Sequence, residues 1–474
     1  MAGSFSFADL NCVAFDLDHT AARYHVDRLQ ELVFSCMTRY LVEHKQYPTD
    51  TMELKFPKEF SFKGMVVDRA AGNLLKVLED KRVVRAYHGT RKQLTKEEIH
   101  ETYPGALLPH PYTGVTTEFY IAMNTYFDMP AAPLFGLLVD RLDAAHEQQS
   151  TAPATPKAAE YASIANDLLT SLYFNFAVYE QGYFFPAFRK DVGSYVFKRP
   201  KVAKWFGQLR ADNVKVLLVT NSLPPFTRLL CEHAFGDDWE NLFDLVIFQA
   251  RKPQFWLPGP REGGLPAFNE VRFLTPKEQE ESRADAANWR ETGLESTLFP
   301  FKRVAMGVKR LETGHLYENG HVGVLTEFLE RLCGKPAAEL KLCYVGDHLI
   351  SDVAVCKATV GWKTIAIVEE LEHVEEGLYS VQEDGSHLAL PHSKVWGSFF
   401  HDKIGDEKVD TAAMRILKDH ANLCCSCLSA FTEHSTSHVY PCAPEHPLGT
   451  CALLQHEIPS YTLYYFTNPL KDSE

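Results

Sequence analysis

Five short apolar runs, each followed at once by polar or turn-forming residues, constrain the fold of this chain most strongly. Runs that are apolar throughout, rather than alternating with polar residues, are typical of strands buried on both faces of a parallel sheet. Stretches of helical character, such as 225–235 and 325–333, lie between several of them. This alternation predicts an α/β fold with a doubly wound parallel sheet. The runs are CVAF before Asp16, VKVLLV before Thr220, FDLVIF before Gln249, LCYV before Gly346, and KTIAIV from Lys363.

The same pattern predicts where a functional site lies. In doubly wound sheets, ligands bind outside the carboxyl ends of the strands, where the turns that follow the strands come together. We therefore expect one site at one edge of the sheet, built from residues that are far apart in the sequence. The polar residues just past the runs are Asp16, Asp18, Thr220, Asn221, Lys252 and Asp347.

A long separation between the first two runs predicts an inserted domain. About 200 residues lie between Asp18 and Thr220, far more than the crossover of a βαβ unit needs. Their composition is helical and aromatic, and the Ala-, Pro- and Thr-rich stretch at 148–160 predicts an exposed loop. The predicted organisation is core over 1–27, a mostly helical cap over 28–189, the rest of the core over 190–400, and a Cys- and His-containing extension over 401–474.

A second, polar interruption of the core is predicted near 257–296. Within it, Thr275 as N-cap, Pro276 at the first helical position and Glu278 two residues later form the pattern of a capping box. This pattern predicts that a polar helix begins there.

Composition limits the partners of this chain of 474 residues. Its formal net charge of −14 disfavours non-specific binding to nucleic acid or to anionic membranes, because both depend on clustered Lys and Arg. No stretch reaches the roughly 18 apolar residues of a membrane span. Eleven cysteines without framework spacing indicate reduced thiols, and we expect a cytoplasmic protein. The sequence leaves open whether the chain forms a homo-oligomer.

Asp16 and Asp18 indicate a particular chemistry. Two carboxylates in the turn after a strand can divide the work on one phosphate ester, because one attacks phosphorus and the other handles the leaving-group proton. Both are anions facing an anionic substrate, so the arrangement requires a hard divalent cation such as Mg²⁺, for which Asp347 offers a further ligand. Lys252 and the polar groups of TNS (220–222) would bind the phosphoryl oxygens.

The elements FDLDHT, LLVTNS, RKP and GDHLISD, in this order, resemble the haloacid dehalogenase (HAD) superfamily of aspartate-nucleophile phosphotransferases. With DLVIFQARKPQFW and YVGDHLISDVAVCKATVGWKTIAIVEEL, the chain is similar to the cytosolic purine 5′-nucleotidases and the 5′-nucleotidase domain-containing proteins, over roughly residues 10 to 400. The resemblance implies a HAD-like core with a cap and a Mg²⁺-dependent phosphomonoester hydrolase.

The resemblance also implies a role for each site residue. Asp16 would be the nucleophile and a metal ligand, and Asp18 the general acid/base, which also touches the metal through its backbone carbonyl. Asp347 would bind Mg²⁺, and Asp352 would support the metal's water shell and the lysine. The phosphate would be bound by Thr220, Asn221 and Lys252.

Two positions depart from the family pattern without removing a catalytic group. Ala21 stands where these nucleotidases usually have leucine, and Gln249 where an aspartate is common. We expect a small phosphorylated substrate, a nucleotide by resemblance. Two alternatives stay open, a phosphatase for another small metabolite and a catalytically weak phosphate-binding regulatory protein on the same fold.

Aromatic residues in the inserted region would stack a nucleobase if they faced the cleft. At helical spacing, however, such residues are more often core, which is the interpretation that we favour. They are Phe119, Tyr120, Tyr126, Phe127 and Phe135.

The C-terminal region poses a separate question. Cys424-x₂-Cys427 and His434-x₃-His438 have the internal spacings of zinc ligands. The six residues between the pairs are fewer than a zinc finger needs, although Cys442 could substitute as a ligand. The sequence favours free thiols and surface histidines and leaves zinc binding as the alternative.

Overall fold

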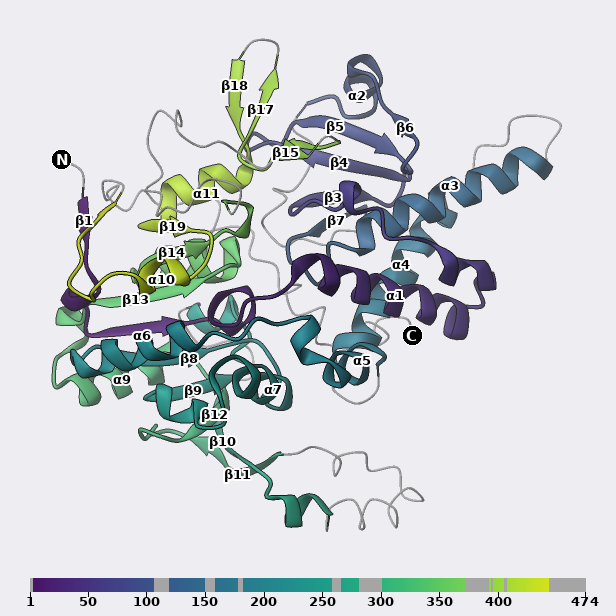
Figure 1. Cartoon of the computed structure of the whole chain (residues 1–474). Helices are drawn as coiled ribbons and strands as arrows, with labels where there is room; N and C mark the ends of the chain where they lie inside the picture. Colours follow the sequence, from purple (N-terminus) through teal and green to yellow (C-terminus); the bar gives the residue numbers. More distant parts are fainter. Residues whose placement is uncertain are drawn as a thin grey trace.

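Two sheets, each covered by helices, form most of the described part of the protein (Figure 1). The computed structural model describes residues 3–105, 119–149, 158–177, 182–257, 266–280, 301–371, 392–393, 395–404 and 407–442. Most of the loop predicted at 148–160 and most of the interruption predicted near 257–296 lie outside these residues. The capping box is confirmed, because Thr275 Oγ1 accepts the Glu278 N–H at 3.3 Å and Glu278 Oε2 accepts the Thr275 N–H at 2.9 Å.

The main sheet has nine strands in the order β11-β10-β12-β9-β8-β2-β13-β14-β19. The strands from β12 to β19 in this order pair in parallel, whereas β10 and β11 are antiparallel to their neighbours. All five predicted strands are confirmed, and they are β2 (Cys12–Phe15), β8 (Lys215–Val219), β9 (Leu245–Phe248), β13 (Leu342–Gly346) and β14 (Lys363–Ile367). The others are β10 (Phe268–Phe273), β11 (Phe301–Val308), β12 (Leu316–Asn319) and β19 (Leu423–Cys425).

Helices cover both faces of the main sheet, as a doubly wound fold requires. Val13 and Phe15 of β2 pack in one apolar cluster with α6 (Pro200–Ala211) and α7 (Pro224–Phe235). Cys12 and Ala14 pack in another cluster with α9 (Val322–Cys333) and α10 (Val355–Val360). Because alternate residues of a strand point to opposite faces, β2 must be apolar throughout. The predicted helices at 225–235 and 325–333 are confirmed. They correspond to α7 and α9.

The region inserted between β2 and β8 contains an antiparallel sheet of its own, in the order β6-β5-β4-β3-β7. The prediction of a mostly helical cap missed this sheet. Gly72, at a φ of 72°, closes the turn between β3 and β4, a backbone conformation that glycine adopts without strain. The strands are β3 (Met65–Asp68), β4 (Asn73–Val77), β5 (Val83–His88), β6 (Lys92–Gln93) and β7 (Tyr120–Met123).

Helices of the inserted region bury both faces of this second sheet. Val67 and Leu74 belong to an apolar cluster with α3 and α4, whereas Val66 and Leu75 face a smaller cluster that includes Ile99 of α2. Figure 1 shows this region beside the main sheet. The helices are α1 (Val26–Lys45), α2 (Lys96–Thr102), α3 (Ala131–Gln149), α4 (Ala158–Phe176) and α5 (Phe184–Lys190).

The C-terminal region joins both sheets. Its strand β19 completes the main sheet beside β14, and its residue Asp402 binds the inserted sheet through Lys76 of β4, at 2.8 Å, and Arg85 of β5, at 3.0 Å. Strand β1 (Gly3–Phe5) pairs with β20 (Tyr440–Cys442). Other strands and α-helices among the described residues are β15 (His392–Ser393), β16 (Gly397–Ser398), β17 (His401–Ile404), β18 (Glu407–Asp410), α11 (Ala412–His420) and α12 (Ser429–Thr432).

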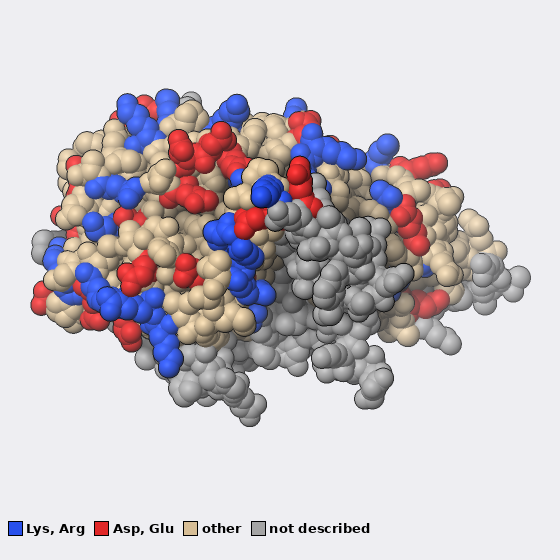
Figure 2. Space-filling model, turned by 90° about the horizontal axis from the view of Figure 1, so that it is seen from below, with Lys and Arg blue, Asp and Glu red and all other residues tan. Residues whose placement is uncertain are grey.

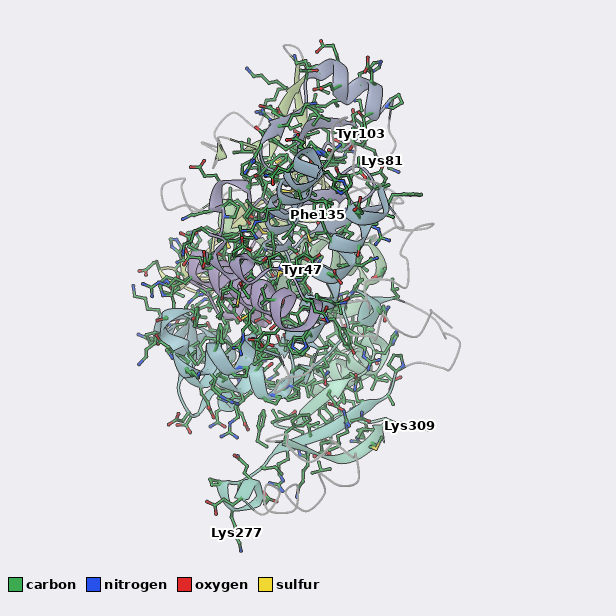
Figure 3. The ribbon with its side chains drawn as sticks, turned by 90° about the vertical axis from the view of Figure 1, so that its right-hand side faces the viewer. Tyr47, Lys81, Tyr103, Phe135, Lys277 and Lys309 are labelled. Atoms are coloured by element: carbon green, nitrogen blue, oxygen red, sulfur yellow. The ribbon has the colours of Figure 1, made fainter. Side chains whose placement is uncertain are left out.

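The inserted region and the β10–β11 pair lie far apart in the structure. In Figure 3, Tyr103 of the inserted region is near the top, and Lys277 and Lys309, which follow β10 and β11 in the sequence, are near the bottom. On the face shown in Figure 2, basic and acidic side chains are interspersed over much of the surface. Among the described helices, none is both long and apolar enough to cross a membrane.

Candidate active site

The turns that follow β2, β9 and β13 bring charged side chains together at one edge of the main sheet. Lys252 Nζ lies 2.8 Å from Asp16 Oδ1 and 2.8 Å from Asp352 Oδ1. Side-chain oxygens of Asp16, Asp347 and Asp352 all lie within 4.8 Å of one another, and all three residues are buried. Residues from both halves of the sequence therefore meet, as predicted from the polar residues at the strand ends.

Lys252 is held in place by its own neighbours as well as by the carboxylates. Its ammonium donates to the Tyr344 hydroxyl at 2.5 Å, and that hydroxyl donates to the carbonyl oxygen of Val219 at 2.8 Å. Its backbone N–H donates to Asn221 Oδ1 at 2.7 Å, while Asn221 Nδ2 donates to the Lys252 carbonyl oxygen at 3.0 Å. This reciprocal pair fastens the turn after β9 to the turn after β8.

The TNS turn after β8 therefore has a positioning role in this structure. Asn221, which the sequence predicted to bind phosphate, forms hydrogen bonds with the Lys252 backbone through both atoms of its side-chain amide. Thr220 is fully buried, and its Oγ1 accepts the Ser222 N–H at 3.0 Å. Ser222, which the sequence analysis grouped with Thr220 and Asn221 as a contact for the phosphoryl oxygens, donates its hydroxyl to Asp18.

Asp18 is held by two hydroxyl groups and lies outside the carboxylate cluster. Tyr24 donates to Asp18 Oδ1 at 2.5 Å, and Ser222 donates to Asp18 Oδ2 at 2.5 Å. Both oxygens thus have a partner, which fixes the orientation of the carboxylate. Among the described side chains, the possible metal ligands are Asp16, Asp347 and Asp352, so any metal contact of Asp18 stays a prediction about its backbone carbonyl.

The GDH turn after β13 places two of the carboxylates. Asp347 follows the strand directly, and the N–H of His348 donates to Asp352 Oδ2 at 3.3 Å. A Cβ atom on Gly346 would lie 2.4 Å from that same Asp352 oxygen. Only glycine therefore leaves room for Asp352 to approach Lys252.

Burial gives this cluster unusual electrostatics. It raises the pKa of the Asp16 carboxyl to about 7, against the opposing attraction of Lys252. It likewise raises the pKa of Asp347 to about 6, against the attraction of Lys63, and it raises the pKa of Asp352. Carboxylates crowded away from water are stabilised by a nearby cation, so the donor set fits a hard divalent metal ion.

Lys63 reaches this cluster from the inserted region and was missed by sequence reasoning. It lies in the turn before β3, is 3% exposed, and places Nζ 3.7 Å from Asp347 Oδ2. Burial opposes its charge, but Glu370 and Asp347 raise the pKa of the ammonium. A single lysine in a turn carries no signal in the sequence.

A second pair of acidic residues that sequence reasoning missed follows β14. Glu369 Oε1 lies 2.8 Å from Nδ1 of the buried His19, whose ring stacks on Tyr24 with centroids 4.5 Å apart. Burial opposes protonation of His19, but the Glu369 carboxylate raises its pKa. Glu370 accepts a hydrogen bond from the Tyr126 hydroxyl at 2.7 Å. Their position just past the KTIAIV run was the signal that could have found them.

The aromatic residues considered for base stacking lie in different surroundings. The rings of Tyr126 and Phe127 are 4.4 and 5.5 Å from the His19 ring, next to the cluster. Phe135 is buried in the core, as favoured from the sequence, while Phe119 is 52% exposed. Tyr120 lies in β7, with its ring 6.5 Å from that of Phe119.

The Cys and His pairs that were considered as alternative zinc ligands form no group of possible metal ligands among the described residues. Cys424 is buried in β19, and the rings of His434 and His438 stack on each other with centroids 4.2 Å apart. Cys427 is a free thiol. The side chain of Cys442 lies outside the described residues. The one group of possible metal ligands in the described part of the chain is the aspartate cluster.

Comparison with known proteins identifies the family. A model of the 5′ nucleotidase family matches residues 2–390. The chain is 30% identical over 431 residues to 5′-nucleotidase domain-containing protein 1 of Homo sapiens, covering 85% of this chain and 84% of that one. It is 26% identical over 374 residues to 5′-nucleotidase domain-containing protein 2 of Homo sapiens, covering 77% and 62%.

The chain belongs to the 5′ nucleotidase family. This membership confirms the resemblance found in the sequence, and the class of enzyme that it supports is a phosphomonoester hydrolase.

Proposed function

We propose that this protein is a Mg²⁺-dependent 5′-nucleotidase with a HAD-like core, which hydrolyses nucleoside monophosphates through an aspartyl-phosphate on Asp16. The observation that carries the proposal is the cluster of three buried carboxylates within 4.8 Å, with Lys252 bridging two of them. Such a cluster is costly to fold unless it serves a cation and an anionic substrate. The inserted region is the proposed cap.

The metal would be held by Asp16 and Asp347, with the backbone carbonyl of Asp18, and Asp352 would support its water shell. When bound, Mg²⁺ supplies positive charge that lets the phosphate approach the carboxylates and stabilises charge on the transferring phosphoryl group. Lys252 adds a fixed positive charge beside Asp16, and the TNS turn keeps Lys252 in place through the side-chain amide of Asn221.

The protein groups divide the reaction into two steps. Asp16 attacks phosphorus while the bond to the ester oxygen breaks, and protonated Asp18 gives its proton to the departing nucleoside oxygen. Asp18 then removes a proton from a water molecule, which attacks the same phosphorus and releases inorganic phosphate and free Asp16. The hydroxyls of Tyr24 and Ser222 keep Asp18 oriented between these steps.

The substrate is proposed from the family, because the names of the relatives specify 5′-nucleotidase domains. A phosphatase for another metabolite would share the same core and differ in the inserted region. We also propose a cytoplasmic location, which the free state of the described cysteines supports.

A phosphate-release screen tests the proposal. Purified protein is incubated with nucleoside 5′-monophosphates, 3′-monophosphates and sugar phosphates, with Mg²⁺ or with excess EDTA. We expect release from 5′-monophosphates that stops in EDTA and is absent from Asp16→Asn, with Asp9→Asn, an exposed residue, as the matched control. Turnover that persists in EDTA or in Asp16→Asn would contradict the mechanism, and a preference for sugar phosphates would contradict the substrate.

A further inference from the structure

Lys63 is a buried ammonium whose hydrogen-bonding capacity is barely used. An ammonium group carries three donors. Within the described part of the chain, the shortest polar contact of Lys63 Nζ is 3.5 Å long, to the carbonyl oxygen of Asp347, and the nearest carboxylate oxygen is 3.7 Å away. Buried donors without good acceptors are costly. The position of Lys63 therefore points to an acceptor that comes from outside the chain.

The surroundings of Lys63 hold its ammonium against the aspartate cluster. The Tyr126 ring lies 4.5 Å from Nζ, and the Tyr126 hydroxyl is fixed by Glu370 at 2.7 Å. Behind the lysine, Gly64 has a φ of 84° and donates its N–H to the Met123 carbonyl oxygen at 2.6 Å, which ties the turn to β7. The ammonium is thus preorganised, and little side-chain freedom remains to be lost on binding.

The charge of Lys63 acts on two kinds of ligand in opposite directions. A divalent cation bound to Asp347 would be repelled by an ammonium 3.7 Å from that carboxylate. A phosphate group attacked by Asp16 would be attracted by the same ammonium and would offer it charged oxygen acceptors. Repulsion of the cation follows from the position of the ammonium alone, so the affinity for phosphate is the quantity that distinguishes a substrate contact from a structural role.

We propose that Lys63 is a substrate-binding residue contributed by the inserted region, which contacts the phosphate group of the substrate and weakens the binding of Mg²⁺ at Asp347. This inference rests on the proposed function and deepens it. Occupation of the phosphate site then requires the inserted region in place, because Lys63 belongs to the turn before β3.

Calorimetric titration of the full chain tests the inference without relying on turnover. Mg²⁺ alone is titrated into wild type and Lys63→Met, and inorganic phosphate is then titrated into each at saturating Mg²⁺. We expect Lys63→Met to bind Mg²⁺ about fivefold more tightly, because a repulsion is removed, and phosphate about tenfold or more weakly, because a charge-assisted contact is lost. Lys63→Arg should stay close to wild type in both titrations.

The matched control is Lys58→Met, which removes a lysine from the same loop whose side chain is 63% exposed and paired with Asp27. It should change neither titration. If Lys63→Met does not fold, as judged by circular dichroism, Lys63→Gln takes its place. Unchanged phosphate affinity, or weaker Mg²⁺ binding, in the charge-removing variant would overturn this inference but leave the proposed function standing. A wild-type protein that binds no Mg²⁺ would overturn the proposed function and this inference with it.

Discussion

The two sheets contribute different things to the candidate site. The turns of the parallel main sheet supply the clustered carboxylates and Lys252, all within a few ångströms. The antiparallel inserted sheet supplies, from the turn before β3, the ammonium of Lys63, and from the turn after β7 the ring of Tyr126. In the proposed function, the main sheet thus provides the groups that react, and the inserted sheet provides groups that bind.

This difference predicts that substitutions in the two sheets have different effects. Changes at the edge of the main sheet should slow every substrate, because they alter the reacting groups. Changes in the inserted sheet should alter affinity or stability and leave the chemistry intact. Variants in each of the two sheets test this expectation.

The largest expected effect comes from Asp18→Asn, on the main-sheet side. With p-nitrophenyl phosphate the leaving group needs no proton, so Asp16 can still be phosphorylated, but loss of general-base help should slow hydrolysis by about 10²–10⁴-fold. A stopped-flow trace should show a burst of nitrophenol of about one per active site, followed by the slow steady state.

Asp9→Asn serves as the control and should turn over steadily. Acid quenching of Asp18→Asn should leave phosphate bound to Asp16, as located by mass spectrometry of peptides. Steady turnover by Asp18→Asn at the wild-type rate, or phosphate on another residue, would remove Asp18 or Asp16 from the assigned roles.

A smaller effect is expected for Gly346→Ala, because the new Cβ would lie 2.4 Å from the Asp352 carboxylate. Displacing Asp352 by a fraction of an ångström also shifts Lys252, and misplacements of about 1 Å can cost about 10²-fold in rate. The measured quantity is kcat on two unrelated substrates, which should fall by the same factor. The control Gly207→Ala, whose Cβ would meet nothing within 4 Å, should leave kcat unchanged.

The smallest effect on chemistry is expected for Lys76→Met, in the inserted sheet. Lys76 Nζ donates to the carbonyl oxygens of Trp396 and Ser398 at 2.9 and 2.7 Å and to Asp402 at 2.8 Å. Loss of these buried contacts should lower the free energy of unfolding by about 3 kcal/mol. Turnover of p-nitrophenyl phosphate should stay within about twofold of wild type, because the hydrogen bonds of Lys76 Nζ go to Trp396, Ser398 and Asp402 and not to the reacting groups.

Urea denaturation measures this loss, with Lys92→Met of β6, whose side chain is 63% exposed, as the control that should cost less than about 1 kcal/mol.

The same loss should depend on pH. Burial would raise the pKa of Asp402, but Arg85 and Lys76 lower it to about 2. A carboxyl with a lowered pKa stabilises the fold above its unfolded pKa of about 3.9 and loses that contribution as the pH falls. The gap between wild type and Lys76→Met should therefore shrink below about pH 4. A large loss of turnover in Lys76→Met would contradict the proposed division between the two sheets, because it would show that Lys76 affects the reacting groups.

The main sheet was predictable because strands buried on both faces must be apolar throughout, as in β2 and β8. Their polar residues follow directly, so the sequence alone was enough to place Asp16 and Asp347 at one edge of the sheet. The inserted sheet was less visible, since its turns depend on single residues such as Gly72 and Lys81, both at positive φ.

Two features of the candidate site depend on tertiary contacts that no local pattern encodes. Asn221 has the sequence signature of a phosphate ligand, but its amide is used by the backbone of Lys252, which approaches from the next strand. Lys63 gains its surroundings only when the inserted region packs against the turn after β13. Each residue type was compatible with several roles, and packing selected among them.

The pairing of β1 with β20 bears on the order in which the protein is made. Gly3 lies opposite Cys442, so a ribosome must synthesise nearly the whole described chain before the first strand finds its partner. Closing contacts of such sequence separation is slow, because loop entropy is lost before the contact is gained. The Phe7 ring packs on Trp205 and also on Phe431 and Tyr440, with centroids 5.0, 5.0 and 6.1 Å apart, so its full set of contacts likewise forms only after the C-terminal region has been made.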